Sequence, residues 1–286
     1  YDASMKLGFS TTDRIVALST CRGRSALALI RTSGASTIDA VNAFLDKPIP
    51  VSAVRKACRR FLINPQNGKT VDDVLITVFV APSSYTGEEM AEIACHGSMA
   101  IVDSILEMLI KGGFRQAEKG EFTFRTFVNG KMDLTQAEAV EEIISARTAS
   151  AASMALDRLH GSIRRTIMDF RASLLLFTAG VELRLDYGED DIPDEPMDFE
   201  VLAFLEKKIR ELIDTYSIGR LYQEGAKVVL CGATNAGKSS LFNRILKEER
   251  SIVSDIHGTT RDYVHDTVSL EGFPLILFDT AGLRTS

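Results

Sequence analysis

The fold of this chain is decided by the stretch Val228-Val229-Leu230-Cys231-Gly232-Ala233-Thr234-Asn235-Ala236-Gly237-Lys238-Ser239-Ser240. Its apolar beginning is typical of a strand, and residues 240–246 have the pattern of a helix. The spacing Gly-x-x-x-x-Gly-Lys-Ser predicts a phosphate-binding P-loop, whose backbone amides surround the phosphates. We expect Lys238 to reach the β- and γ-phosphates and the Ser239 hydroxyl to bind magnesium. A glycine-rich turn with a chance Lys-Ser pair is the alternative, which the flanking strand and helix disfavour.

A second motif supports this interpretation. Residues 274–278 are a short apolar run of the buried-strand kind, and Asp279-Thr280-Ala281-Gly282 follows directly. A carboxylate at the end of a neighbouring strand suits a partner of the magnesium ion, and the Gly282 amide is expected to sense the γ-phosphate. By itself Asp-x-x-Gly is a common turn, so its position after a P-loop decides the interpretation.

A polar loop, Asp255-Ile256-His257-Gly258-Thr259-Thr260-Arg261-Asp262, lies between the two motifs. Its two threonines predict a switch loop that offers a hydroxyl to magnesium. A complete P-loop GTPase domain is longer than the stretch from Lys227 to Ser286, and no Asn-Lys-x-Asp motif follows Asp279. We therefore expect an incomplete GTPase domain without its guanine-reading motif.

Composition limits the function classes. The chain has 286 residues, 45% of them hydrophobic and 25% charged, with a net charge of −6, which argues against binding nucleic acid by bulk charge. No apolar run reaches transmembrane length, and residues 1–6 do not begin a signal peptide, so we expect a cytoplasmic protein. Four scattered cysteines predict buried or half-buried thiols in a reducing compartment: Cys21, Cys58, Cys95 and Cys231.

Residues 1–130 have the pattern of a mixed α/β domain. Strands are predicted at residues 14–19, 26–31, 60–63, 73–80 and 90–95, and helices at residues 36–44 and 100–110. Ser36 is the expected N-cap of the first helix, and Gly112-Gly113 ends the second. The turn-rich residues 64–68 predict a hairpin between the third and fourth strands.

Residues 133–220 change to helical periodicity. Asp133 and Gln136 predict a capping box. A continuous apolar stripe with spacings of three or four predicts one long helix, and its members are Leu156, Leu159, Ile163, Ile167, Phe170, Leu174, Phe177, Val181 and Leu185. The acidic residues 187–196 end the stripe, a further helix is predicted over residues 199–216, and residues 219–225 are expected to be a linker.

Six further stretches add a resemblance to a known family. They are Leu29-Ile30-Arg31-Thr32-Ser33-Gly34, Ser84-Tyr85-Thr86-Gly87-Glu88-Glu89, Cys95-His96-Gly97, Lys119-Gly120-Glu121-Phe122-Thr123, Asn129-Gly130-Lys131-Met132-Asp133-Leu134-Thr135-Gln136-Ala137-Glu138-Ala139 and Gly258-Thr259-Thr260-Arg261-Asp262. Together with the order of domains, they make the chain resemble the MnmE (TrmE) family of tRNA wobble-uridine modification GTPases over essentially its whole length.

The resemblance implies a multidomain α/β protein with three parts. Residues 1–130 correspond to a mixed α/β domain that binds folate and dimerises. Residues 131–224 correspond to a helical domain, which in the family is completed by a C-terminal segment with a reactive cysteine. Residues 225–286 correspond to an incomplete P-loop GTPase domain of the Ras-like kind.

The resemblance also implies a folate site. The family's contacts to formyl-tetrahydrofolate, the one-carbon source, fall on Arg31, Glu92 and Lys131. Two cations suit a ligand with a glutamate tail, and a carboxylate can hold the paired donors of a pterin. By residue type alone, these three would be ordinary surface charges.

For the nucleotide site, Leu283 stands where Ras-type GTPases place a water-orienting Gln, so hydrolysis needs other assistance. The resemblance implies a potassium ion held by Asn235 and by oxygens of the switch-loop residues Ser254, Ile256 and Thr259. The resemblance implies Ser239 and Thr260 as magnesium ligands. It implies Lys238, Asn235, Thr260 and Asp279 as catalytic residues. The implied nucleotide contacts are Asn235, Ala236, Gly237, Lys238, Ser239, Ser240, Ser254, Asp255, Ile256, His257, Gly258, Thr259, Thr260, Asp279, Thr280, Ala281 and Gly282.

The function implied is that of a GTP-hydrolysing enzyme. It takes part in carboxymethylaminomethyl-type modification of the wobble uridine of certain tRNAs, with GTP, magnesium, potassium and formyl-tetrahydrofolate as cofactors. The implied partners are a second copy bound through the N-terminal domain, tRNA, and a flavin-dependent modification protein of the GidA (MnmG) type in a heterotetramer. No membrane association is expected.

Three alternatives share parts of this pattern. An RNA-binding GTPase of ribosome assembly has the GTPase motifs but lacks the domain of residues 1–130. A folate-dependent one-carbon transferase with a regulatory nucleotide domain predicts folate turnover by residues 1–130 alone. A P-loop kinase needs a phosphate-acceptor site and a lid, and does not explain Gly-Thr-Thr before Asp-Thr-Ala-Gly.

Overall fold

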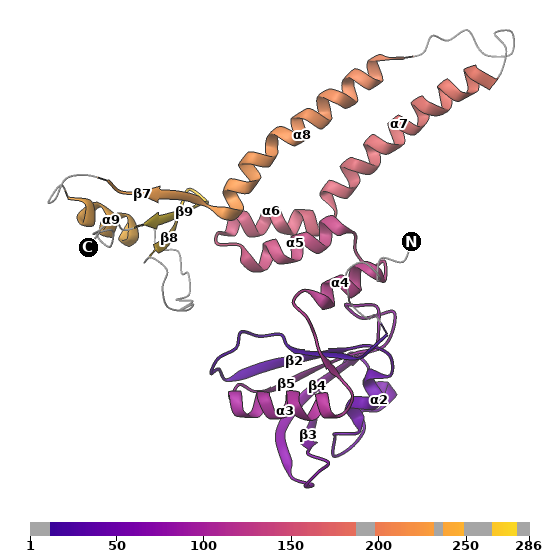
Figure 1. Cartoon of the computed structure of the whole chain (residues 1–286), viewed down its shortest axis with the longest axis vertical. Coiled ribbons are helices and arrows are strands. Elements are labelled where there is room, and N and C mark those ends of the chain that lie inside the picture. Colours follow the sequence, from indigo (N-terminus) through magenta and orange to yellow (C-terminus); the bar gives the residue numbers. More distant parts are fainter. Residues whose placement is uncertain (1–11, 187–197, 232–236, 249–264, 279–286) are drawn as a thin grey trace. The chain divides into compact units, whose positions relative to one another are not determined.

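The computed structural model describes residues 12–186, 198–231, 237–248 and 265–278. They belong to two compact units, Tyr1–Ala137 and Glu138–Ser286 (Figure 1). Along the chain, a mixed α/β part comes first, long helices follow, and a part with a strand, a P-loop sequence and a helix comes last. This order confirms the predicted fold class.

The first unit contains a six-stranded sheet in the order β3-β4-β5-β2-β1-β6. Its strands are β1 (Ile15–Leu18), β2 (Leu27–Ser33), β3 (Cys58–Ile63), β4 (Thr70–Phe79), β5 (Met90–His96) and β6 (Arg115–Gln116). Neighbouring strands are antiparallel except for β1 and β6, which are parallel. The five predicted strands are confirmed, and so is the hairpin between β3 and β4.

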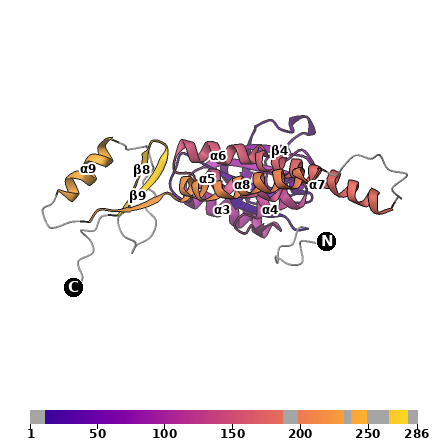
Figure 2. The same ribbon diagram turned by 90° about the horizontal axis from the view of Figure 1, so that it is seen from above.

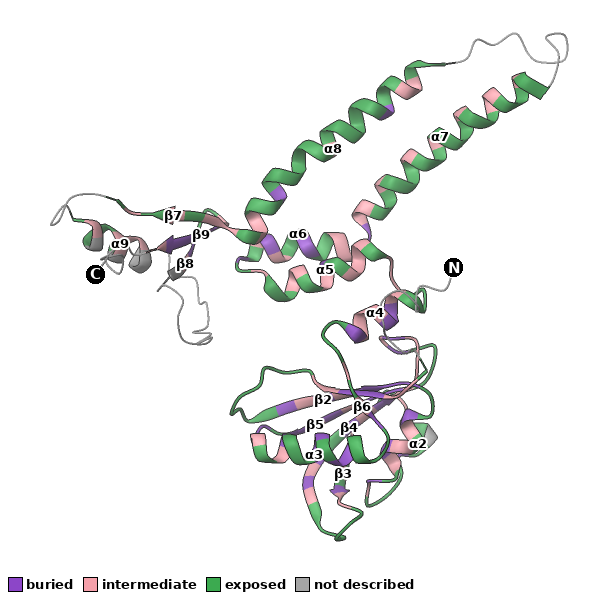
Figure 3. Cartoon of the chain, in the orientation of Figure 1, coloured by how far each residue is buried: buried purple, intermediate pink, exposed green. Residues whose placement is uncertain are grey.

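The helices of residues 37–42 and 99–111 contribute to the core on one face of this sheet. The helical segments of the unit are α2 (Thr37–Asn42), η1 (Val51–Ala53), α3 (Met99–Lys111) and α4 (Glu121–Val128). Along β5, Ala91, Ile93 and Cys95 are buried in the core shared with α3, because alternate side chains of a strand point to opposite faces. Glu92 lies between them and therefore belongs to the other face of the sheet. Figure 3 shows the resulting alternation of buried and more exposed positions along the strands.

The predicted cap of the first helix is wrong. Ser36 has a φ of 54°, in the left-handed region, and its side chain makes no capping hydrogen bond. Instead, the Ile38 N–H donates to Glu89 Oε2 at 3.3 Å, so a carboxylate from the loop before β5 serves the first turn of the helix. A residue distant in sequence has replaced the local cap.

Four helices follow the sheet. They are α5 (Leu134–Ser145), α6 (Ala149–Leu159), α7 (Ser162–Asp186) and α8 (Glu200–Glu224). The predicted capping box at the start of α5 is confirmed: the Asp133 N–H donates to Gln136 Oε1 at 3.0 Å, and the Gln136 N–H donates to Asp133 Oδ1 at 2.9 Å. These reciprocal bonds satisfy two backbone donors at the helix start.

The predicted single helix under the apolar stripe is wrong, because α6 and α7 are separate. Gly161 has a φ of +79°, a conformation that suits glycine and ends α6. Along α7 no described residue is buried, and Leu174 and Leu185 expose 49% and 79% of their surface (Figure 3). The apolar spacing therefore predicted helix correctly, but neither its continuity nor its burial.

The last predicted helix is longer than expected. The expected linker from residue 219 is helical as far as the end of α8, and Gly219 is buried within that helix. Gly225 ends it, with a φ of +79°. Gly219 concealed the helix, because glycine is unfavourable in a helix interior and the predicted linker began there.

The four cysteines are free thiols. Cys95 is buried and Cys58 half-buried, as predicted, whereas Cys21 and Cys231 are exposed, which corrects the prediction for those two. Burial and the charge of Asp72 raise the pKa of the Cys95 thiol to about 11, so it stays protonated near neutral pH. Across the described segments, no helix combines the length and apolar character needed to cross a membrane.

Candidate functional site

The strand–loop–helix part forms a small three-stranded sheet. Its elements are β7 (Ala226–Val229), α9 (Lys238–Glu248), β8 (His265–Leu270) and β9 (Phe273–Phe278). The strand order is β7-β9-β8, and α9 lies to one side of the β8–β9 hairpin (Figure 2). The predicted strand at residues 274–278 and the predicted helix after the P-loop are confirmed, whereas β8 was not predicted.

The register of this sheet brings two predicted phosphate motifs to one edge. β7 and β9 are parallel neighbours, and Val229 lies directly opposite Phe278. Both strands therefore end at the same level, and their carboxyl ends face the same side. The P-loop sequence follows β7 and the Asp-Thr-Ala-Gly motif follows β9, so both motifs leave the sheet at this edge. Ligands of open α/β sheets bind outside the carboxyl ends of the strands.

Only part of the predicted nucleotide site is described. Gly237 has a φ of +82°, and Lys238, Ser239 and Ser240 form the first turn of α9. This places three predicted residues at a helix N-terminus, where backbone N–H groups are available to an anion. The predicted contacts Asn235 and Ala236, those of residues 254–260 and those of residues 279–282 lie outside the described residues.

The β8–β9 hairpin is attached to the helices of its own unit. The Tyr222 ring near the end of α8 stacks on Phe273 of β9, with ring centroids 4.1 Å apart and an interplanar angle of 27°. Arg147 Nη1 donates to Thr267 Oγ1 of β8 at 3.2 Å. At the turn of the hairpin, Gly272 approaches Ser150 so closely that a Cβ would come within 2.5 Å of its hydroxyl oxygen. The segment between the switch-loop sequence and the Asp-Thr-Ala-Gly motif thus contacts α8, α6 and the connection between α5 and α6.

In the first unit, two of the three predicted folate residues lie side by side. Arg31 on β2 and Glu92 on β5 are directly opposite each other. Arg31 Nε and Nη2 both donate to Glu92 Oε1, at 3.0 and 2.7 Å. Their side chains expose only 26% and 25% of their surface, so this is a well-shielded charge pair on the sheet face opposite α3.

Two aromatic rings flank the arginine. The Arg31 guanidinium carbon lies 5.3 Å from the centroid of the Tyr85 ring and 5.9 Å from that of Phe122. Both distances are within the range of cation–π attraction. The Tyr85 hydroxyl is in turn hydrogen-bonded to the Thr123 hydroxyl at 3.0 Å, which fixes the ring against α4.

The third predicted residue, Lys131, reaches the loop that carries Tyr85. Its Nζ donates to the carbonyl oxygen of Pro82 at 2.9 Å, and Asn129 Nδ2 donates to the carbonyl oxygen of Thr86 at 2.7 Å. A Cβ on Gly87, whose φ is +81°, would come within 3.3 Å of both Asn129 and Lys131. The structure therefore brings Lys131 to the same loop, but its bond is to a backbone carbonyl and not to the Arg31–Glu92 pair.

A network of buried charges holds the loop of residues 84–89, which carries Tyr85, in place. Arg125 and Glu121 of α4 have fully buried side chains. Arg125 Nη2 donates to Glu121 Oε1 at 3.1 Å and to Asp13 Oδ1 at 2.6 Å, while Nη1 donates to Glu88 Oε2 at 3.2 Å. Ser33 of β2 also donates to Glu88 Oε2, at 2.7 Å. The network thus ties the loop to α4, to β2 and to the segment before β1.

The charges in this network shift one another's pKa values. Burial by itself raises the pKa of Glu121, but hydrogen bonds from Arg115, the Glu118 N–H and Arg125 outweigh burial and leave the pKa lowered. The pKa of Asp13 is lowered in the same way, since bonds from Arg115 and Arg125 outweigh the effect of burial. Hydrogen bonds to Glu121 and Asp13 raise the pKa of Arg115. All these groups therefore stay ionised at neutral pH.

Tyr85, Phe122 and Arg125 were not among the predicted site residues. The available signal was their presence in the Ser84–Glu89 and Lys119–Thr123 stretches and just beyond them, which carry the resemblance. An aromatic ring beside a charge is common in any sequence, so its contact with Arg31 became visible only in three dimensions.

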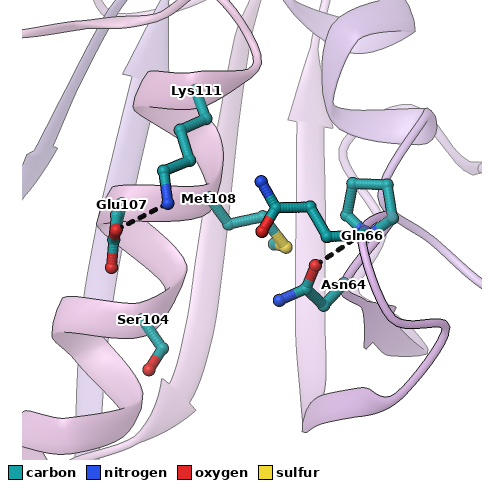
Figure 4. A pocket seen from close by; sticks show the side chains of 7 residues that line it. Asn64, Gln66, Ser104, Glu107, Met108 and Lys111 are labelled. Atoms are coloured by element: carbon teal, nitrogen blue, oxygen red, sulfur yellow. Dashed lines mark hydrogen bonds and ion pairs between the residues drawn. The ribbon is translucent and has the colours of Figure 1, made fainter.

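A shallow pocket lies elsewhere on the first unit, between the β3–β4 turn and α3 (Figure 4). It has a volume of about 110 Å³, and none of the predicted site residues lines it. Some of its polar groups already have partners: Lys111 Nζ donates to Glu107 Oε1 at 2.7 Å, and the backbone Gln66 N–H donates to Asn64 Oδ1 at 2.9 Å. Over the described ranges, no group of three or more His, Cys, Asp or Glu residues is placed to hold a metal ion.

Comparison with known proteins identifies the family. A model described as GTP-binding protein TrmE N-terminus matches residues 14–131, and the MnmE helical domain matches residues 134–280. Relatives named tRNA modification GTPase MnmE are 41% identical over 284 residues in Treponema denticola, 42% over 273 in Aquifex aeolicus and 40% over 278 in Alkaliphilus oremlandii. These alignments cover 98%, 94% and 95% of this chain and 60% of each relative, so the chain spans about 60% of the length of the curated relatives it matches. The chain belongs to the MnmE (TrmE) family of tRNA modification GTPases.

Proposed function

We propose that the protein hydrolyses GTP as part of the modification of tRNA. The observation that carries this proposal is the common edge at which the P-loop sequence and the Asp-Thr-Ala-Gly motif leave the parallel strands β7 and β9. The names of the relatives support the same reaction. We further propose that the modification is of the carboxymethylaminomethyl type at the wobble uridine, as the resemblance implies.

The described residues suit the phosphates of a nucleotide. Lys238 begins α9, so its charge and the N–H groups of the first helical turn serve the same anion. Magnesium supplies charge neutralisation between the β- and γ-phosphates when it is bound, and we assign it to Ser239 and Thr260. The remaining proposed contacts are Asn235, Ala236, Ser240, residues 254–260 and residues 279–282.

Replacing Lys238 by Ala in the full-length protein tests the nucleotide site. We expect affinity for GTP or turnover to fall by about tenfold or more, because a point charge on the β/γ-phosphates is lost. Lys227→Ala is the matched control, since Lys227 is an exposed lysine on β7 of the same small sheet. The readouts are nucleotide titration and phosphate release. Equal values for Lys238→Ala, Lys227→Ala and the unmodified protein would refute the proposal.

We also propose that potassium assists hydrolysis, held by Asn235, Ser254, Ile256 and Thr259. The argument is the chemistry of Leu283, whose hydrocarbon side chain cannot orient water. A monovalent cation held by oxygens can neutralise the charge that develops on the phosphates. We expect turnover of the full-length protein to be higher in potassium chloride than in sodium chloride, and Asn235→Ala to reduce that preference. Identical rates in the two salts would remove potassium from the mechanism.

For the first unit we propose formyl-tetrahydrofolate as ligand, bound by Arg31, Glu92 and Lys131. The donor set suits a folate, because a half-buried carboxylate and two cations are available around one loop. Glu92 keeps Oε2 for a ligand donor, since both bonds from Arg31 go to Oε1. Calorimetry with 5-formyl-tetrahydrofolate tests this assignment.

The organisation of the whole protein is proposed from the resemblance. We place the folate and dimerisation domain at residues 1–130, the helical domain at residues 131–224 and the GTPase domain from residue 225. The partners proposed are a second copy, tRNA and a GidA (MnmG)-type flavoprotein, in the cytoplasm. Several apolar residues of α7 are exposed, which supports the proposal that additional helices pack against α7 in the complete helical domain.

A further inference from the structure

We infer that the β3 edge of the first unit is a surface that binds the phosphates of tRNA through the cations of residues 47–71. This inference rests on the proposed role in tRNA modification and deepens it, because it assigns the RNA to a particular surface. We call this surface the basic edge, and its cations are Lys47, Arg55, Lys56, Arg60 and Lys69.

The first argument is the distribution of charge along the sequence. Between Asp46 and Asp72 the chain has six lysines and arginines and no Asp or Glu, whereas the whole chain has a net charge of −6. A protein with this net charge repels a polyanion over most of its surface, so a nucleic acid is attracted to a local excess of positive charge. Residues 47–71 supply such an excess.

The second argument is that the acids beside the basic edge already have partners. Asp73 of β4 is paired with Arg59, the sixth cation of the segment, whose Nη2 donates to Asp73 Oδ2 at 2.6 Å. The carboxylate of Asp46 accepts the backbone N–H of Phe61 at 3.0 Å. Arg59 is therefore neutralised, and for this reason it is not counted in the basic edge.

The five cations of the basic edge keep their charge. Among the described residues, none of the five is paired with a carboxylate. Arg55 Nη2 donates to the carbonyl oxygen of Ser83 at 2.9 Å, and Arg60 Nε donates to the carbonyl oxygen of Lys47 at 3.0 Å. A backbone carbonyl orients a guanidinium but does not cancel its charge, so a phosphate oxygen forms a stronger, charge-assisted bond with the same kind of group.

The third argument is the position of these cations along an edge strand. β3 is at the end of the six-stranded sheet (Figure 1). Lys56 lies two residues before β3, and Lys69 lies at its other end, where the Lys69 carbonyl accepts the Asn64 N–H at 2.9 Å. Lys47 lies between these ends, because the N–H of the preceding residue donates to the Phe61 carbonyl at 3.0 Å. A strand of this length spans about 20 Å, which is enough to reach several phosphates of an RNA strand.

The composition of the basic edge favours RNA over a membrane surface. Four of its cations are exposed, and Arg60 is half-buried. Among the described side chains of residues 47–71, Phe61 is the one large apolar side chain that is exposed, at 41%. Binding in a membrane interface requires an apolar face beside the cations, whereas a phosphate backbone requires only the charges.

Two double variants of the full-length protein test the inference. Lys47→Gln with Lys56→Gln removes two charges from the basic edge. Lys207→Gln with Lys208→Gln removes two charges from α8, where Lys208 is paired with Glu211 at 2.9 Å. The net charge changes equally in both variants, so only the place of the lost charges differs. Basal GTP turnover and the unfolding midpoint, measured alongside, are expected to stay unchanged in both.

Binding of tRNA is measured by fluorescence anisotropy over a series of salt concentrations. For the basic-edge variant, we expect affinity at low salt to fall by about tenfold, because two phosphate contacts are lost. The slope of log affinity against log salt concentration should become shallower by about two, one for each lysine. For the α8 variant we expect little change in either quantity.

The other results are distinguishable. Equal losses in the two double variants would overturn the inference, because the number of charges and not their place would then decide binding. Unchanged tRNA binding in the basic-edge variant, with loss of binding to vesicles that contain phosphatidylserine, would assign the basic edge to a membrane instead. An unmodified protein that binds no tRNA would refute the proposed tRNA partner itself.

Discussion

The sheet unit and the α7–α8 helices differ in how far they bury their apolar and charged residues. In the sheet unit, a core of buried residues lies between the strands and α3, and even Arg125 and Glu121 are fully buried. In α7, none of the described residues is buried, and its apolar positions are half-buried or exposed. Sequence periodicity was a good guide to helix in both regions, yet it indicated burial in only one.

This difference in burial determines how much a single side chain contributes to the free energy of unfolding in each region. Buried residues of the sheet unit have neighbours on all sides, so removing one leaves a cavity or an unpaired charge. Most residues of α7 and α8 keep contact with solvent, so their replacement removes little from the folded state of this chain. The same type of substitution should therefore have very different effects in the two regions.

The largest effect is expected from Arg125→Met. Removing this guanidinium leaves Glu121 buried without one of its charge partners, and breaking a buried pair in this way costs about 3–5 kcal/mol. Hydrogen exchange of the β5 amides in the full chain measures the loss. Arg210→Ala is the control in α8, where Arg210 and Glu206 form an exposed i,i+4 pair, and we expect little change there. Similar losses in both variants would contradict the comparison.

A second prediction compares two apolar truncations. Ile93→Ala removes a fully buried β5 side chain and should cost about 2–5 kcal/mol, whereas Leu174→Ala on α7 should change stability by no more than about 0.5 kcal/mol. Denaturant unfolding of each variant, followed by exchange of β5 and α7 amides, distinguishes the two. A large loss for Leu174→Ala would mean that α7 packs more tightly in solution than its exposure indicates.

The smallest predicted effect is on pH dependence. The pKa values of Asp13 and Glu121 are lowered in the folded chain, so their contribution to stability is present above the unfolded pKa values of about 3.8 and 4.5. It is lost as the pH falls through the lower, folded values. We expect the β1 and β5 amides to lose protection below about pH 4.5, after correction for intrinsic exchange, and more steeply than the α8 amides. A parallel decline in both regions would contradict a specific role of this network.

Several features followed from the sequence because they depend on neighbouring residues. The P-loop spacing between a strand and a helix, the hairpin at residues 64–68 and the capping box of Asp133 and Gln136 are examples. In each case the interacting groups lie within a few residues of one another. Backbone geometry and short-range hydrogen bonds then leave few alternatives.

One feature was missed because a competing contact came from far along the chain: Glu89 replaced the expected Ser36 cap. The break of the apolar stripe is local, because Gly161 adopts a positive φ there. For the candidate folate site, residue types and the resemblance named Arg31, Glu92 and Lys131. They did not reveal that the first two are paired or that Tyr85 and Phe122 flank the arginine.

By itself, the sequence therefore determined most of the strands and helices, the position of the P-loop motif between a strand and a helix, and the family. Tertiary structure alone decided which charges meet: Arg125 and Asp13 are 112 residues apart, and Arg31 and Glu92 are 61 apart. Local patterns arise from the covalent geometry and solvation of adjacent residues. A charge pair between distant strands depends instead on sheet register, which the packing of the whole core selects.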